Sequence, residues 1–214
     1  MTWVKAIIFD WDLTLWNSWD LHLWLLEYTA DMLAVPRPSS DIVASAFTSP
    51  FIEHLQHVLG VPIERILPVY MGMYHSMVSK KGHLYEDVKG CLEDLRKARL
   101  KVALCSDKRE VFGLSELSLC GLASSFDSVR FLKEGDTYKP NPDGLLQVIR
   151  DLNICSREVI YIGDSVSDIG CARAAGAISG AARWASVNLS GLDTSNADYQ
   201  FDNMRDLMEL IGIY

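Results

Sequence analysis

Four short runs of mainly apolar residues constrain the fold of this 214-residue chain more than any other feature. The first run spans residues 4–9 and is followed by Asp10. Similar runs occupy residues 102–105, 129–131 and 159–162. Runs without polar alternation are typical of strands that are buried on both faces of a parallel sheet. Helix-like or loop segments separate these runs along the chain. The pattern therefore predicts an α/β fold with a doubly wound, Rossmann-like parallel sheet.

The region from residue 16 to residue 82 does not follow this alternation. It contains only helical patterns, broken at prolines and at a glycine. The expected helices cover residues 20–34, 40–47, 50–59 and 62–79. A helical block placed directly after the first strand predicts an inserted helical cap domain over residues 16–82. Residues 1–15 and 83–214 would then form the α/β core, in which further helices are expected over residues 86–98, 142–152 and 167–175.

Charge and cysteine content narrow the function classes. A net charge of −8 argues against partners such as nucleic acid or an anionic membrane surface. The five cysteines form no C-x-x-C pair, so we expect buried free thiols in a reducing compartment. No signal peptide is evident, and the most apolar stretch, residues 21–35, is too short and too charged to span a bilayer. We therefore expect a soluble, cytoplasmic protein.

Two aspartates, Asp10 and Asp12, follow the first predicted strand. Ligands of open α/β sheets bind at the carboxyl ends of strands, so both carboxylates could face one pocket. Asp164 and Asp168 form a second acidic pair after the run at 159–162, and carboxylate oxygens of this kind suit Mg²⁺. Each pair also fits an ordinary turn or helix cap, because aspartate is common at both.

Ser106 and Lys139 lie at two further connections. The Ser106 hydroxyl follows the run at 102–105 and could donate to a phosphate oxygen, although serine is also a common helix N-cap. Pro140 keeps Lys139 extended, which allows its long side chain to be aimed. Taken alone, each residue is better explained as a cap or a solvated lysine. Together the four signals supply a nucleophile, a general acid and base, a cation, a hydrogen-bond donor to phosphate, and metal ligands. This combination favours phosphoryl transfer.

In this order, the motifs resemble those of the haloacid dehalogenase superfamily, in its phosphatase branch with a helical cap. Asp10-Trp11-Asp12-Leu13-Thr14 is similar to the first family motif, Ser106 to the second, Lys139 to the third, and Gly163 to Asp168 to the fourth. The resemblance covers nearly the whole chain, including a closing strand around residues 197–201 with a helix after it. Two positions depart from the pattern. Leu13 replaces a glycine, which we expect to be a mild change, and Asp107 stands where asparagine is common.

The resemblance implies a Mg²⁺-dependent phosphomonoester hydrolase that acts on a small phosphorylated metabolite. Asp10 would be the nucleophile that forms an aspartyl-phosphate, and Asp12 the general acid and base. Ser106 and Lys139 would bind the phosphoryl group. The metal would be held by Asp10, Asp12 and Asp164. The remaining assignments are Asp168 as a residue that orients metal-bound water or Lys139, and Trp11 and Trp16 as substrate contacts.

Several alternatives stay open at this point. A phosphomutase similar to β-phosphoglucomutase would share the core and the cap, and a catalytically silent binding or regulatory module would share the fold. The presence of Asp12 argues against the dehalogenase branch, because a departing halide needs no proton. A phosphonatase that uses a lysine of the cap is a weaker alternative. His54 and His57 are expected to be surface residues. The chain could be a monomer or a homodimer.

Overall fold

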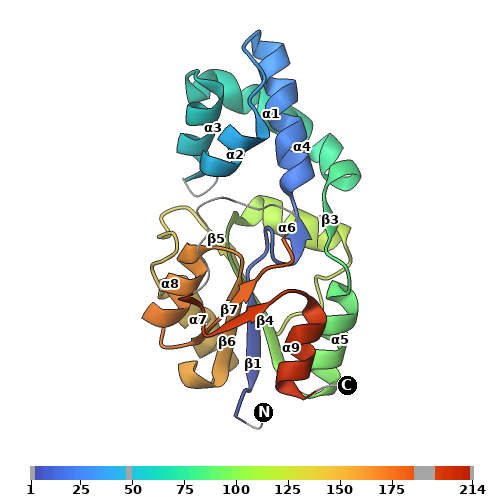
Figure 1. The fold of residues 1–214 in the computed structure, drawn as a ribbon, viewed down its shortest axis with the longest axis vertical. Helices are drawn as coiled ribbons and strands as arrows, with labels where there is room; N and C mark the ends of the chain where they lie inside the picture. Colours follow the sequence, from blue (N-terminus) through green and yellow to red (C-terminus); the bar gives the residue numbers. More distant parts are fainter. Residues whose placement is uncertain (1–2, 47–49, 186–195, 213–214) are drawn as a thin grey trace. The chain divides into compact units, whose positions relative to one another are not determined.

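The computed structural model describes residues 3–46, 50–185 and 196–212, and the chain divides into two compact units. The first unit contains a six-stranded parallel sheet in the order β5-β4-β1-β6-β7-β8, drawn in Figure 1. Its strands are β1 (Ala6–Phe9), β4 (Lys101–Arg109), β5 (Ser128–Leu132), β6 (Val159–Gly163), β7 (Ile178–Ala182) and β8 (Tyr199–Phe201). The predicted doubly wound parallel sheet is confirmed.

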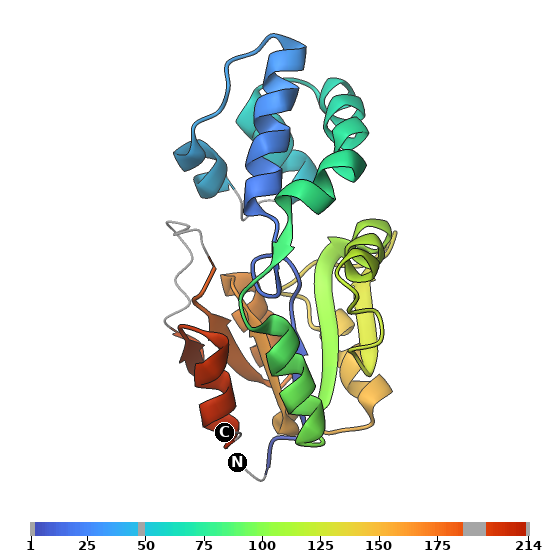
Figure 2. The same ribbon diagram turned by 90° about the vertical axis from the view of Figure 1, so that its right-hand side faces the viewer.

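Helices cover both faces of this sheet. In Figures 1 and 2, α7 and α8 lie on one face, and α5 and α9 lie on the other. The helical elements of this unit are α5 (Val88–Lys97), α6 (Glu110–Leu119), α7 (Asp143–Leu152), the single 3-10 turn η1 (Ser156–Glu158), α8 (Val166–Ala174) and α9 (Met204–Ile211). The helix α6 and the strand β7 were not expected from the sequence.

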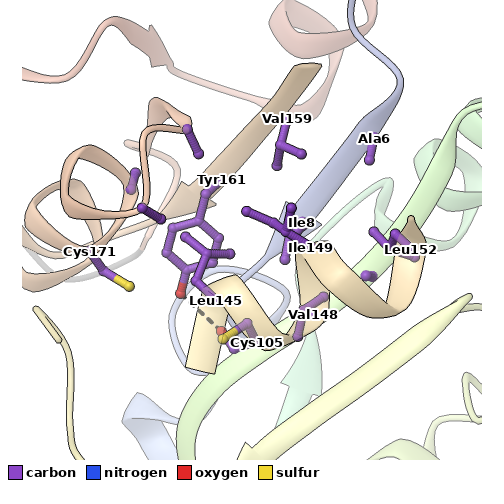
Figure 3. Packing of buried hydrophobic residues seen from close by; sticks show 14 residues of the cluster. Ala6, Ile8, Cys105, Leu145, Val148, Ile149, Leu152, Val159, Tyr161 and Cys171 are labelled. Atoms are coloured by element: carbon purple, nitrogen blue, oxygen red, sulfur yellow. Dashed lines mark hydrogen bonds between the residues drawn. The ribbon is translucent and has the colours of Figure 1, made fainter. Parts of the chain in front are cut away.

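The core between the sheet and helices α7 and α8 is built from alternate residues of the central strands. Ala6 and Ile8 of β1 and Val159 and Tyr161 of β6 point to this side and are buried. Figure 3 shows these side chains packed against the apolar face of α7, with the Tyr161 ring directed toward Cys105 of β4. Burial on both faces explains why these strands lack the polar alternation of a half-exposed sheet.

The strand register fixes which residues reach the same edge of the sheet. Phe9, the last residue of β1, pairs with Leu104 of β4 on one side and with Ile162 of β6 on the other. The residues that follow these three positions therefore leave the sheet together. The carboxyl ends of β1, β4 and β6 form the edge at which ligands collect in folds of this kind.

The second unit contains residues 17–83 and is helical. Its helices are α1 (Trp19–Leu33), α2 (Ser40–Ala46), α3 (Phe51–Leu59) and α4 (Ile63–Lys81). Pro50 and Pro62 precede two of these helices, and Gly60 ends α3 in the left-handed conformation at φ 67°. Two short strands, β2 (Trp16–Asn17) and β3 (His83–Leu84), pair with each other where the chain enters and leaves this unit.

His54 of this unit is not a surface residue, and that expectation was wrong. Its side chain is 3% exposed, and its Nε2 lies 2.7 Å from His22 Nε2. The second His22 nitrogen, Nδ1, lies 2.7 Å from the Tyr70 hydroxyl. Burial lowers the pKa of His54. Sequence spacing did not reveal this cluster because its members come from α1, α3 and α4.

Within the described residues, no helix combines the length and apolar character needed to cross a membrane.

Candidate active site

Three carboxylates meet at the carboxyl ends of β1 and β6. Asp10, Asp164 and Asp168 each place an oxygen within 4.8 Å of the others. Burial is the main cause that raises the pKa of Asp10, to about 7, and the carboxylate of Asp168 adds to it, whereas Lys139 opposes it. Burial, and then Asp168 and Asp10, raises the pKa of Asp164 well above its ordinary value. Such crowding of acids is costly unless cations are present.

Lys139 supplies one cation to this cluster. Its Nζ lies 3.1 Å from Asp10 Oδ1 and 2.6 Å from Asp168 Oδ1, and its side chain is buried. Burial alone would lower the pKa of Lys139, but the carboxylates of Asp10, Asp168 and Asp107 raise it well above its ordinary value. The lysine is therefore charged, and its ammonium group is fixed beside Asp10. It is not the solvated surface residue that the sequence alone would favour.

Asp168 is held in place through both of its oxygens. Oδ1 accepts hydrogen bonds from Lys139 and from the Tyr161 hydroxyl at 3.0 Å, and Oδ2 accepts from the Ser165 backbone N–H at 3.0 Å and hydroxyl at 2.5 Å. A Cβ atom added at Gly163 would lie well under 3.0 Å from the Asp168 carboxyl group. The glycine of the fourth motif therefore makes room for Asp168.

The acidic cluster fits a divalent cation. Oδ1 of Asp10 is buried and accepts no hydrogen bond among the described residues, although Lys139 lies at ion-pair distance. An additional cation would satisfy this oxygen and would offset the burial of Asp10 and Asp164. Asp168 already uses both oxygens within the protein. Hard carboxylate oxygens with few protein ligands are the donor set that Mg²⁺ prefers.

Residues 106 and 107 sit at the end of the regular part of β4, where the register with β5 shifts between Cys105 and Arg109. The hydrogen bond from buried Ser106 to Asp10 lowers the pKa of that carboxyl. Asp107 Oδ2 instead accepts the backbone N–H of Lys139 at 3.0 Å. The Asp107 carboxylate is therefore engaged with the chain around Lys139, through a bond that an asparagine could also accept, and its charge adds to the raised pKa of Lys139.

The loop after Asp10 is compact. The Trp11 carbonyl accepts backbone N–H groups of Leu15 and Trp16 at 3.0 and 2.9 Å, and Leu13 adopts the left-handed φ of 57°. A glycine would be favoured there, because a side chain in this conformation costs about 1–2 kcal/mol. Complete burial of the Leu13 side chain offsets that cost. The expected mildness of the change at position 13 stays a prediction, and the structure places leucine there in a conformation that favours glycine.

The two tryptophans of this loop are packing residues in the structure. The Trp11 and Trp16 rings stack at 5.8 Å with an interplanar angle of 8°, and both are buried. The predicted substrate contacts of Trp11 and Trp16 stay a prediction, and the burial of both indoles does not support them.

Sequence reasoning missed three residues that contact the predicted set. The Tyr161 hydroxyl lies 3.0 Å from Asp168 Oδ1 and 2.9 Å from the Cys105 carbonyl, and these two acceptors share its single proton; Figure 3 shows the bond to Cys105. Lys108 Nζ lies 3.0 Å from Asp12 Oδ1 and 3.0 Å from Glu116 Oε1. Tyr161 reads as a core residue of a strand, and Glu116 belongs to a helix that had not been predicted. For Lys108, the sequence offered one signal, which was its position directly after Ser106 and Asp107.

Comparison with known proteins places this geometry in a family. The sequence profile of the haloacid dehalogenase-like hydrolases matches residues 7–182. The chain belongs to this family. The predicted superfamily is thereby confirmed, and the predicted enzyme class, a haloacid dehalogenase-family phosphatase, is confirmed by this match together with relatives that are named as phosphatases.

Named relatives of this haloacid dehalogenase-like hydrolase include two phosphatases. A protein of Caldanaerobacter subterraneus, provisionally named pyrophosphatase PpaX, is 28% identical over 97% of this chain and 94% of its own length. A phosphoglycolate phosphatase of Vibrio parahaemolyticus is 31% identical over 61% of this chain and 58% of its own length. A solved haloacid dehalogenase-like protein from Streptococcus pneumoniae has the same fold, with a TM-score of 0.85, 21% identity and coverage of 99% of this chain and 100% of that one.

Proposed function

We propose that the chain is a Mg²⁺-dependent phosphomonoester hydrolase that acts on a small phosphorylated metabolite through an aspartyl-phosphate at Asp10. The observation that carries this proposal is the buried ammonium group of Lys139 between Asp10 and Asp168, beside the acidic cluster with Asp164. A fixed cation next to a nucleophilic carboxylate suits the binding of a phosphoryl dianion.

The reaction would proceed in two displacements. In the first, an Asp10 carboxylate oxygen bonds to phosphorus while the bond from phosphorus to the substrate oxygen breaks, and the Asp12 carboxyl gives its proton to the departing oxygen. In the second, a water oxygen bonds to phosphorus while Asp12 takes the water proton. The bond between Asp10 and phosphorus breaks, which releases orthophosphate and restores both aspartates.

The other predicted residues keep supporting roles in this proposal. Ser106 and Lys139 would donate to the phosphoryl oxygens, and Asp168 would hold Lys139 in position. Mg²⁺, held by the carboxylates of Asp10 and Asp164 and by Asp12, would neutralise the negative charge that otherwise keeps an anionic nucleophile from an anionic phosphate.

We further propose that the helical unit, residues 17–83, is a cap that selects the substrate. Relatives named for phosphoglycolate, a phosphomonoester, and for pyrophosphate, a phosphoric anhydride, make these two compounds the first candidates. Hydrolysis of pyrophosphate alone would replace the monoester by an anhydride as the substrate class. Exchange of these residues for the corresponding helices of a relative should change which phosphate is hydrolysed. A cytoplasmic location belongs to the same proposal and is supported by five free cysteines.

The test is phosphate release by the purified protein with Mg²⁺ from pyrophosphate, phosphoglycolate, sugar phosphates and an aryl phosphate. We expect release by the wild type, loss in Asp10→Asn and on chelation, and no loss in the surface variant Asp94→Asn. Transfer between sugar phosphate positions without orthophosphate release would favour the phosphomutase instead. A folded, Mg²⁺-loaded protein that acts on none of these compounds would refute the proposal.

A further inference from the structure

A buried carboxylate on α6 lies behind the loop that carries Asp12. Glu116 is completely buried, and charged side chains are rarely buried without partners. Its Oε2 accepts the Trp11 indole N–H at 2.7 Å, and its Oε1 lies 3.0 Å from Lys108 Nζ. Both oxygens of Glu116 are therefore committed to residues that flank the reacting aspartates in sequence or in space.

Lys108 connects this buried carboxylate to Asp12. Its Nζ lies 3.0 Å from Asp12 Oδ1 as well as from Glu116 Oε1, and its side chain is 12% exposed, compared with 29% for Asp12. An ammonium group fixed from behind by a fully buried carboxylate has little freedom, so it holds the more exposed carboxylate in one orientation. A surface pair such as Lys5–Glu158, with a lysine 57% exposed, has no such anchor.

The same glutamate also fixes the backbone from which Asp12 projects. Trp11 lies between Asp10 and Asp12, and its ring is clamped by the stacked Trp16 ring and by the edge-on Phe131 ring, at 6.3 Å. The hydrogen bond from the Trp11 indole N–H to Glu116 Oε2 further restricts rotation of that ring. Glu116 thus restrains Asp12 in two ways, through the Trp11 backbone and through Lys108.

We propose that Glu116 and Lys108 are positioning residues that hold the Asp12 carboxylate in the orientation needed for proton transfer. This inference rests on the proposed function, because it assigns a partner to the general acid and base of that reaction. Neither residue needs to touch the phosphoryl group. General acid and base catalysis contributes roughly 10²–10⁴-fold to a rate and depends on hydrogen-bond geometry, so a loosened Asp12 should lose part of that factor.

The kinetic test uses Lys108→Met, Glu116→Gln and the control Lys5→Met. With an alkyl phosphate, the first two variants should lower kcat roughly 10–100-fold while KM changes little, since the loss lies within the acid–base contribution. With an activated aryl phosphate, whose leaving group needs no proton, formation of the phosphoenzyme in a single turnover should be nearly unaffected. Lys108→Arg should restore part of the alkyl phosphate activity.

A double-mutant cycle separates this role from a general structural one. In an Asp12→Asn background, Lys108→Met should cause no further loss, because its effect acts through Asp12. Additive losses, or equal losses on both classes of substrate, would overturn the inference while leaving the proposed function intact.

A measurement without turnover keeps the two proposals apart. In nitrogen-15 NMR spectra, Glu116→Gln and Lys108→Met should shift the backbone amide signal of Asp12, and Lys5→Met should not. If the wild type releases no phosphate from any compound, the proposed function fails, and these spectra still decide whether Glu116 controls Asp12. An unmoved Asp12 signal in Glu116→Gln would overturn the inference in either case.

Discussion

Replacement of Gly163 by alanine tests the packing of the acidic cluster most directly. The new Cβ would lie well under 3.0 Å from the carboxyl group of Asp168, a separation that real Cβ contacts essentially never show. The Asp168 side chain cannot rotate away without losing hydrogen bonds, because Ser165, Tyr161 and Lys139 bond its two oxygens. The variant must therefore shift the backbone of β6 or break part of this bonding.

The expected cost follows from these two terms. Overpacking a dense site costs about 1–3 kcal/mol, and loss of one hydrogen bond to a charged group costs about 1.5–3 kcal/mol. Because relaxation trades one term against the other, we expect Gly163→Ala to lower the free energy of unfolding by about 1–3 kcal/mol. For a chain of this size, that corresponds to a Tm lower by roughly 2–12 °C in a thermal unfolding experiment.

Gly90 provides the matched control. It lies inside helix α5, and a Cβ added there meets no heavy atom within 4 Å. Gly90→Ala should therefore stabilise the protein by about 0.5–1 kcal/mol, the usual gain within a helix. A Gly163→Ala protein that unfolds at the wild-type temperature would refute the reasoning about Asp168.

Three further predictions address the metal, the histidine cluster and the Tyr161 hydroxyl. Mg²⁺ should raise the Tm of the wild type and of Asp94→Asn but not of Asp164→Asn, as followed by thermal unfolding, since a ligand at 100 times its Kd adds about 2.7 kcal/mol. Burial lowers the pKa of His54, so the unfolded chain takes up the proton first, and the free energy of unfolding should fall as the pH drops below about 6.5. Urea unfolding at pH values above and below this point should show the loss in the wild type and in His57→Gln but a smaller loss in His54→Phe. Tyr161→Phe removes a buried hydroxyl that donates to the Cys105 carbonyl and should cost about 1–3 kcal/mol in the same assay, whereas an unchanged midpoint would contradict the role assigned to that bond.

The central strands and most helices could be predicted because their signals are local. Apolar runs identify β1 and β6, which are buried on both faces, and Pro50, Gly60 and Pro62 mark helix ends that the structure reproduces. The same local reasoning placed Asp10 and Asp164 directly after strands, at one edge of a parallel sheet.

The parts that sequence reasoning missed lack such signals or depend on distant contacts. Helix α6 shows no clear apolar stripe, and β7 is built largely of small residues rather than β-branched or aromatic ones. The contact between Trp11 and Glu116 joins residues 105 positions apart, so no spacing rule could reveal it. The burial of His54 was missed for the same reason, because its partners His22 and Tyr70 lie on other helices.

The pairing of Phe9 with Leu104 and Ile162 has a consequence for how this protein can change. The relative heights of Asp10, Ser106 and Asp164 follow from this register, which the pattern of buried side chains on the sheet specifies. Conservative replacement of core residues should therefore leave the reacting groups aligned. Deletion of a single residue within β1 should instead turn Asp10 to the opposite face of the sheet. The site should therefore tolerate conservative substitutions in the core but not insertions or deletions within the strands.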